Sequence, residues 1–225
     1  HFFLHYIYMK VTINIPESLS EITLEQYQRW HKVSNNNEDE NFLKQKMIEI
    51  FCNVSLKDIL TIKPRHINAI VEELKKVFED KPALIQRFIY KDIEFGFIPK
   101  LDDMSFGEYI DLDTYLPEWE TMHNAMNILY RPVIYSKKNK YLIESYQGSD
   151  VYDMREIPLN VVFSALVFFW NLKKELLSHM GSYLAKQKEV KLPAQVMDFL
   201  RNGVGINQSM DWLKEMSESS MKLQS

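Results

Sequence analysis

Several features of secreted, nucleic-acid-binding and membrane proteins are missing from this sequence. It has a single cysteine, Cys52, so no disulfide can form within the chain and no metal site can be built on several cysteines. This fits a reducing cytoplasm. The 27 Lys and Arg residues stand against 31 Asp and Glu residues, and the net charge of −4 does not indicate nucleic acid as the main partner.

A segment that could cross a membrane is also missing. A helix needs about 20 apolar residues in a row to span a bilayer. The longest apolar run, residues 159–170, is shorter and contains Asn160 and Ser164, so it predicts a buried core helix. Residues 1–8 precede Met9 and lack the basic start and the small-residue cleavage site of a secretory signal. We interpret residues 1–8 as a leader, either translated upstream or added for expression.

Motifs of catalysis are absent as well. The sequence contains no phosphate-binding loop, no dinucleotide-binding glycine motif and no G-x-S-x-G turn, and the histidines beyond residue 8 include no pair at the i, i+4 spacing of helical metal ligands. Five carboxylates lie within residues 102–113. A helix start accounts for them better than a divalent-metal site, because negative charge is favoured there. We therefore expect no enzyme activity, no cofactor, and neither catalytic nor metal-binding residues.

What the sequence does contain is material for a core. Hydrophobic residues make up 46% of the 225 residues and charged residues 26%, which is typical of globular proteins. Most apolar residues recur at helical spacing. We predict an α+β fold that is predominantly helical, with a helical bundle-like core and one or two small β-hairpins. The predicted division is a main α+β domain at 9–180 and a partly flexible, helical C-terminal extension at 181–225.

Local patterns locate several elements. Two capping boxes, Thr23–Gln26 and Ser105–Glu108, predict helix starts. A helix is also expected from 119 to 130, ended by Arg131 and Pro132. Runs of β-branched and aromatic residues predict strands. These are a strand at 10–15, a hairpin formed by 84–90 and 93–98, and a second hairpin formed by 133–135 and 141–146.

Aromatic and methionine side chains are abundant, with 13 Phe, 12 Tyr, 4 Trp and 11 Met. Such side chains fill cores and also form protein-binding surfaces, because they adapt or anchor at a low entropy cost. Two segments are predicted to bind a partner: the acidic helix start after residue 101, and a short C-terminal helix able to dock in a groove. The candidate residues are Asp103, Glu108, Tyr109, Asp111 and Tyr115 in the first segment, and Met210, Trp212 and Met216 in the second.

One further pattern allows a different kind of partner. Lys137, Lys138 and Lys140 lie between Tyr135 and Tyr141, a combination that can bind single-stranded nucleic acid by charge and stacking. Three lysines in a hairpin loop are more often a solvated tip. Because the rest of the chain supplies no basic stripe, we regard nucleic acid as an unlikely partner.

The middle of the chain resembles a group of tailed-bacteriophage proteins. The resemblance covers roughly residues 9–177. It is carried by the segments 93–101 (IEFGFIPKL), 106–112 (FGEYIDL), 119–126 (WETMHNAM), 129–132 (LYRP) and 157–159 (IPL), the last leading into the apolar helix. In that group the same order recurs among proteins of virion structure and assembly, and the pattern is similar to that of tail assembly chaperones.

This resemblance implies a function in virion assembly. A tail assembly chaperone binds the aggregation-prone tape-measure protein before the tail tube forms around it. The expected partner is therefore another phage protein, and the expected location is the host cell cytoplasm. The first alternative is a minor structural component of the virion, in the tail, the neck or associated with the capsid. The second is a nucleic-acid-binding accessory factor. Homo-oligomers are possible, and we expect no membrane partner.

Overall fold

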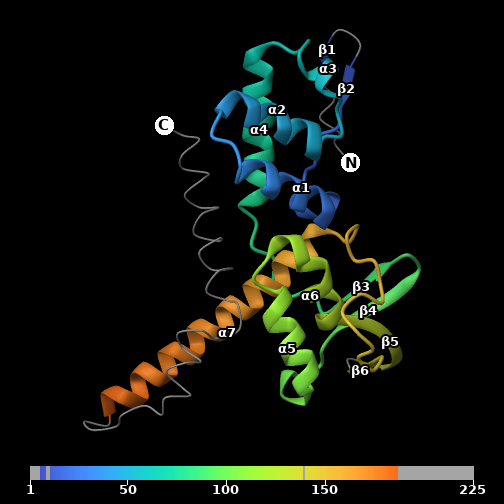
Figure 1. Ribbon diagram of the computed structural model, residues 1–225, viewed down its shortest axis with the longest axis vertical. Coiled ribbons are helices and arrows are strands. Elements are labelled where there is room, and N and C mark those ends of the chain that lie inside the picture. Colours follow the sequence, from blue (N-terminus) through green and yellow to red (C-terminus); the bar gives the residue numbers. More distant parts are fainter. Residues whose placement is uncertain (1–5, 9–10, 139, 187–225) are drawn as a thin grey trace. The chain divides into compact units, whose positions relative to one another are not determined.

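The structure, a computed structural model, describes residues 6–8, 11–138 and 140–186, with only the backbone described for 6–8, 11–12 and 173–186. It confirms the predicted class, because seven α-helices and a small antiparallel sheet make up most of the described chain (Figure 1). The last helix of the described residues, α7 (Leu159–Lys186), runs past the predicted boundary at residue 180. The rest of the predicted C-terminal extension lies outside the described residues.

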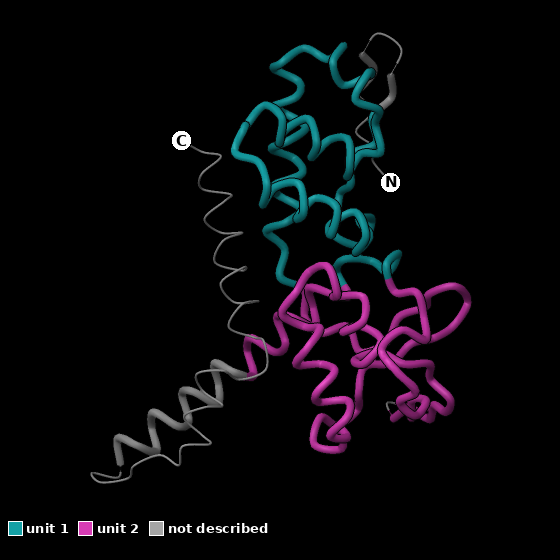
Figure 2. The backbone as a smooth tube through the Cα atoms, viewed as in Figure 1, with its two compact units in different colours: residues 1–81, 155–160, 220–225 teal, residues 82–154, 161–219 magenta. Residues whose placement is uncertain are grey.

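The described residues form two compact units (Figure 2). Unit 1 takes in 6–8, 11–81 and 155–160, and unit 2 takes in 82–154 and 161–186. The short segment 155–160 thus belongs with the beginning of the chain, although all of residues 82–154 lie between them in sequence. One main domain was predicted for 9–180, and its division into two units is a finding of the structure.

Unit 1 is built from four helices. These are α1 (Leu24–Ser34), α2 (Glu40–Phe51), α3 (Leu56–Ile59) and α4 (Pro64–Phe78). Leu24, Ile48 and Leu74 are completely buried between them. The Phe78 ring lies 5.0 Å from the ring centre of Phe51, so helices α2 and α4 also share aromatic contacts. This unit is the helical core that the apolar spacing predicts.

The start of α1 confirms the first capping box. The Thr23 side chain accepts a hydrogen bond from the Gln26 backbone, and the Gln26 side chain accepts one from the Thr23 backbone. The buried Gln26 amide also donates to the Ile50 carbonyl at 2.7 Å, which ties α1 to the end of α2. The segment 155–160 adds to this end of α1, because its carbonyls accept the Leu24 and Glu25 N–H groups at 3.0 and 2.7 Å. Four free N–H groups at a helix start need such partners.

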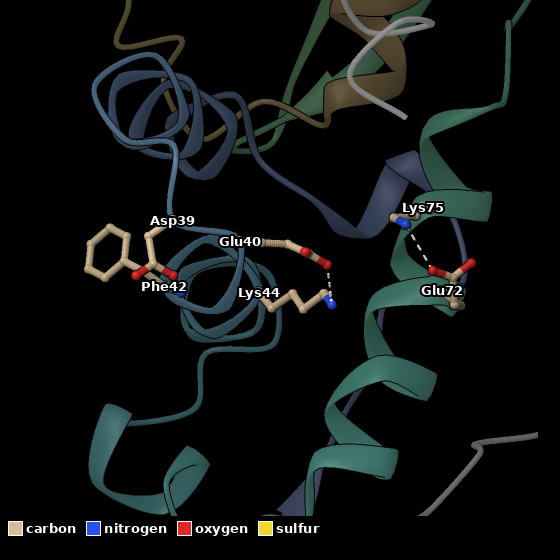
Figure 3. Close-up of polar contacts among 6 residues, drawn as sticks. All are labelled: Asp39, Glu40, Phe42, Lys44, Glu72 and Lys75. Carbon is tan, nitrogen blue, oxygen red and sulfur yellow. Dashed lines mark hydrogen bonds and ion pairs between the residues drawn. The ribbon is translucent and has the colours of Figure 1, made fainter. Parts of the chain in front are cut away.

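Polar side chains on α2 and α4 form contacts within their own helix. Asp39 caps α2 by accepting the Phe42 N–H at 3.0 Å, and Figure 3 shows this end of the helix. Glu40 and Lys44 form an ion pair one turn apart on α2, and Glu72 and Lys75 form another on α4 (Figure 3). In both pairs the lysine side chain is mostly buried and the glutamate is exposed. Lysine stems thereby cover apolar surface while their charges reach solvent.

A short antiparallel pair, β1 (Tyr6–Tyr8) with β2 (Val11–Ile13), completes unit 1. It confirms a strand within the predicted range 10–15, although that strand is shorter than expected. Part of the segment interpreted as a leader thus pairs as a strand. Its origin stays a prediction.

Unit 2 contains a four-stranded antiparallel sheet with the order β3-β4-β5-β6. The strands are β3 (Arg87–Tyr90), β4 (Ile93–Phe97), β5 (Tyr130–Lys137) and β6 (Lys140–Ile143). Both predicted hairpins are confirmed. Lys91 and Asp92 take positive φ values of 50° and 62° in the first turn, so this two-residue turn forms without glycine. Pairing of β4 with β5 joins the two hairpins into one sheet, which local patterns do not predict.

One boundary differs from the prediction. The helix expected from 119 to 130 is a 3₁₀ turn, η3 (Trp119–Thr121), followed by α6 (Met122–Leu129). Tyr130 already belongs to β5, and Pro132 lies inside that strand opposite Phe95. Pro132 has no N–H to donate, but its carbonyl accepts the Glu144 N–H at 2.9 Å. The helix therefore ends one residue earlier than predicted, and the strand expected from residue 133 begins at Tyr130.

Aromatic side chains form the core of unit 2. Phe97 contacts Tyr130 in the sheet and Phe168 on α7, with ring centres 5.2 and 5.5 Å apart. The buried Ser164 hydroxyl of α7 accepts the Ile85 N–H at 3.1 Å, just before β3. The apolar run 159–170 is therefore a largely buried helix, as predicted.

Candidate functional site

The helix α5 (Phe106–Tyr115) carries the first set of predicted binding residues, and its start is well defined. It follows a 3₁₀ turn, η2 (Leu101–Asp103). Ser105 caps the helix and forms the second predicted capping box with Glu108. The Glu108 carboxylate accepts the Ser105 N–H at 2.7 Å, and the Ser105 hydroxyl accepts the Glu108 N–H at 3.3 Å. This box fixes which residues of α5 face inward.

The inward side of α5 is partly polar. Glu108 is only 5% exposed, and its second carboxylate oxygen pairs with Arg131 of β5 at 2.8 Å. Both of its oxygens are therefore engaged, and Glu108 cannot contact a partner directly. Glu108 was predicted as a partner-binding residue, but its side chain is buried and is not part of the surface. The burial arises because Arg131, far away in sequence, brings a compensating charge.

Asp111 lies one turn further along the same side. Its carboxylate accepts a hydrogen bond from the Tyr146 hydroxyl, and the Arg131 guanidinium lies 5.9 Å from the Tyr146 ring centre. Burial, and then the hydrogen bond to the Asp111 carboxylate, raise the pKa of Tyr146. Asp111 thus helps to hold α5 in place and is only half-buried.

The outward side of α5 is apolar. Phe106 is 78% exposed, Tyr109 is 40% exposed and Ile110 is 47% exposed. Residues three and four positions apart lie next to one another on a helix, so these side chains form one patch. Asp113 is exposed and follows on the same side. We call these four residues the α5 face. An amphipathic helix ordinarily turns its apolar stripe to the core, so α5 is unusual in exposing apolar residues opposite a buried ion pair.

Acidic residues surround the α5 face. Asp102 and Asp103 lie in the turn before the helix and are exposed, as is Asp113 within it. Lys100 is the nearby cation, with its amino group 3.7 Å from an Asp103 oxygen and its side chain exposed. A partner that covered this face would therefore meet apolar side chains with a mainly negative margin.

The structure supports some of the predicted binding residues more than others. Asp103 and Tyr109 are exposed beside or on the α5 face, whereas Asp111 and Tyr115 are half-buried on its other side. Met210, Trp212 and Met216 lie outside the described residues. Phe106 and Ile110 were not among the predicted residues. The sequence signal that could have found them is their spacing, because Phe106, Tyr109, Ile110 and Asp113 fall on one helical side.

A second exposed apolar surface lies on the β5–β6 hairpin. Tyr135 pairs with Leu142, and Lys137 pairs with Lys140 at the end of the hairpin. Alternate residues of a strand point to the same side, so these four residues share one side of the hairpin. We call them the hairpin face. Tyr135 and Leu142 are each more than half exposed, and both lysines are exposed. This face therefore combines apolar side chains with positive charge.

The described residues do not form a well-developed site for a small molecule or a metal ion. A depression beside Arg131 and Tyr152 has a cavity volume of about 10 Å³, far below the roughly 300–1,000 Å³ of typical ligand pockets. Within residues 6–8, 11–138 and 140–186, no three His, Cys, Asp or Glu side chains are grouped as metal ligands. Cys52 is buried, and this burial raises the pKa of its thiol to about 12. It is the small buried hydrophobe that its position predicts.

The described helices include none with the length and apolar character needed to cross a bilayer. Comparison with protein-family models, characterised proteins and solved structures found no match for this chain.

Proposed function

We propose that this chain is a non-enzymatic phage morphogenesis protein, a tail assembly chaperone that binds the tape-measure protein through the α5 face. The observation that carries the proposal is the exposed apolar side of α5, opposite the buried Glu108–Arg131 pair. The segments that carry the resemblance to tailed-bacteriophage proteins include residues 106–112, which make up most of this helix. The shared segment and the exposed apolar patch thus coincide.

The chemistry of the α5 face suits a helical partner. A tape-measure protein is a long helical chain with apolar stripes that need cover until the tail tube forms. Phe106, Tyr109 and Ile110 offer an apolar patch one to two turns long on a helix, against which the apolar stripe of a partner helix can pack. Full burial of a large apolar side chain contributes about 1.5–3 kcal/mol. The acidic margin favours partner segments whose apolar stripe is flanked by Lys or Arg.

Co-expression tests this proposal. Coupled expression with the tape-measure protein should keep that protein soluble and allow the two to be purified together. Phe106→Ser combined with Ile110→Ser should abolish this effect, because both side chains are exposed and their loss leaves the core intact. The matched control is Leu60→Ser in unit 1, which removes a side chain that is 66% exposed and lies outside α5.

One result of the co-expression test would contradict the chaperone function. If the tape-measure protein remains insoluble with the unaltered chain, the chaperone function is wrong. Mass spectrometry of purified particles then tests the structural alternative. A chaperone should be absent from particles, whereas a minor component of the tail, neck or capsid should be present at a fixed copy number.

The nucleic-acid alternative has one observation in its favour. Lys137, Lys138 and Lys140 are all exposed at the tip of the β5–β6 hairpin, next to the exposed Tyr135. Binding of a fluorescent single-stranded oligonucleotide should then weaken steeply with salt and fall further in a Lys137→Ala, Lys140→Ala variant. Binding that is absent at low salt would remove this alternative.

A further inference from the structure

We propose that this chain associates with a second copy of itself in a head-to-tail manner, the α5 face of one copy covering the hairpin face of the next. Both faces belong to unit 2 and occupy separate elements, α5 and the β5–β6 hairpin (Figure 1). Each face consists of exposed apolar side chains accompanied by charged ones. The charges are mainly negative at the α5 face and positive at the hairpin face.

The charges support this pairing. Asp102 and Asp113 beside and on the α5 face have no ion-pair partner within the described chain, and Asp103 has only a long contact to Lys100. Lys137 and Lys140 on the hairpin face also lack an ion-pair partner among the described residues. Contact between the two faces brings the unpaired carboxylates to the unpaired ammonium groups. Complementary potentials of this kind select a partner and its orientation.

The same charges disfavour the two arrangements in which a face meets its own copy. A dimer formed by two α5 faces would place Asp102, Asp103 and Asp113 against their own copies. A dimer formed by two hairpin faces would place Lys137 and Lys140 against theirs. Like charges brought together weaken an interface by an amount that salt reduces. Head-to-tail contact is the arrangement in which apolar groups meet and opposite charges meet as well.

The apolar groups on the hairpin face match those of α5 in kind. Tyr135 and Leu142 form a cross-strand pair that leaves both side chains exposed, and Ile134 is also exposed where the register of β5 shifts. A helix can pack its apolar side on the apolar side of a strand pair. Phe106 is the most exposed large side chain of α5, so it is the residue expected to contact Tyr135 and Leu142.

The size of the faces indicates a weak interface. A few large side chains on each copy bury roughly half of the ~800 Å² per partner found in standard interfaces. We therefore expect a dissociation constant on the order of micromolar or weaker. A head-to-tail contact leaves one α5 face and one hairpin face free at the ends, so further copies add until a ring closes or a short filament forms.

This inference uses the α5 face of the proposed function but does not depend on the tape-measure partner. Self-association would cover the apolar side of α5 while no partner is present. A partner helix would then compete with the hairpin face of the neighbouring copy. The hairpin face distinguishes self-association from tape-measure binding, because only self-association requires it.

Sedimentation velocity of the full chain over a hundredfold range of concentration gives the first test. The mean mass should rise with concentration, and the apparent dissociation constant should weaken several-fold between low and high salt. Phe106→Glu on the α5 face, or Leu142→Glu on the hairpin face, should each weaken association at least tenfold. Leu60→Glu in unit 1 is the control of similar exposure and should have no effect.

Mixing the two variants gives the decisive test. The Phe106→Glu variant keeps its hairpin face, and the Leu142→Glu variant keeps its α5 face. Each should be monomeric alone, whereas an equal mixture should form a dimer and stop there. Circular dichroism and melting temperature of each variant establish that both are folded before they are mixed.

Several results would overturn the inference. One is a monomer at every concentration. Another is self-association that persists in one of the two folded variants alone, since this points to a symmetric contact through the face which that variant keeps. A mixture of folded variants that remains monomeric also contradicts the head-to-tail contact. Loss of self-association in Leu142→Glu with intact tape-measure binding supports the inference and leaves the proposed function standing. Intact self-association with no tape-measure binding by the unaltered chain removes the proposed function alone.

Discussion

The two units differ in how many large apolar side chains they leave exposed. Among the described residues of unit 1, the large apolar side chains that remain exposed are Leu56 and Leu60, both near the short helix α3. Unit 2 exposes such side chains on α5, on both hairpins and on α7. Soluble chains rarely leave contiguous apolar patches uncovered unless another molecule contacts them. Both proposed contacts therefore use surfaces of unit 2.

Their charged side chains differ as well. Unit 1 pairs neighbours along one helix, as in Lys76–Glu73, where both side chains are exposed. Unit 2 buries an ion pair between residues far apart in sequence, Glu108 and Arg131. Exposed pairs contribute little to stability, whereas removing one member of a buried pair strands the other charge. The polar contacts that matter most for folding are therefore in the unit that also carries the exposed faces.

The largest expected effect comes from breaking that buried pair. Glu108→Gln should destabilise the protein by about 3 kcal/mol or more, because Arg131 would remain buried without a counter-charge. Urea denaturation measures the loss, and hydrogen exchange should show faster opening in unit 2. Arg131→Met combined with Glu108→Leu should recover much of the stability. If the single variant is as stable as the original, the pair does not hold α5.

A smaller loss is expected at the centre of the sheet. The Tyr141 ring lies over Gly96, and its hydroxyl donates a hydrogen bond to the Phe97 carbonyl at 2.7 Å. A Cβ atom added to Gly96 would lie 2.5 Å from this ring. Gly96→Ala should therefore cost about 1–3 kcal/mol through overpacking. The matched substitution Gly107→Ala meets no neighbouring atom and should be neutral or slightly stabilising. Equal melting temperatures for both variants would contradict this view of the sheet.

The two capping boxes allow a direct comparison of the units. Thr23→Ala and Ser105→Ala each remove a side chain that caps a helix start, at a typical cost of about 1 kcal/mol. The loss at Thr23 should be the smaller, because carbonyls of segment 155–160 still hold the first N–H groups of α1. Thermal denaturation of the two variants under one condition ranks them. A larger loss at Thr23 would contradict this expectation.

The smallest effects on stability are expected at exposed side chains, including Phe106, where the effect on association is large. Phe106→Ser in unit 2 and Leu60→Ser in unit 1 should both change the free energy of unfolding by less than about 0.5 kcal/mol, since both side chains are exposed. Phe106→Ser alone should weaken binding to other chains. A pull-down with the tape-measure protein, read beside the melting temperature, separates the two effects.

Much of the local structure could be predicted from the sequence. The capping boxes at Thr23 and Ser105 depend on residues three positions apart, and each hairpin depends on a short run of β-branched and aromatic residues. Neighbouring residues decide these features, so a local pattern is enough. The pairing of β4 with β5 joins distant segments and has no local signal.

The candidate site was only half predictable for the same reason. The acidic start of α5 is visible in the sequence, and Asp103 and Tyr109 are exposed there. The burial of Glu108 depends on Arg131, which reaches it from another element. Once Glu108 and Asp111 turn inward, Phe106 and Ile110 must turn outward. The direction of a helix side is thus set by a long-range contact that periodicity alone does not reveal.

The segment 155–160 has a consequence for the order of folding during synthesis. Its carbonyls bond the first N–H groups of α1, and the Leu159 N–H bonds the Ile22 carbonyl at 2.8 Å. Unit 1 therefore cannot be complete when residue 81 leaves the ribosome, because its last piece is made only after residues 82–154. A fragment ending at residue 81 would lack these contacts. Nascent chains arrested before and after residue 160 should differ in protease resistance at α1.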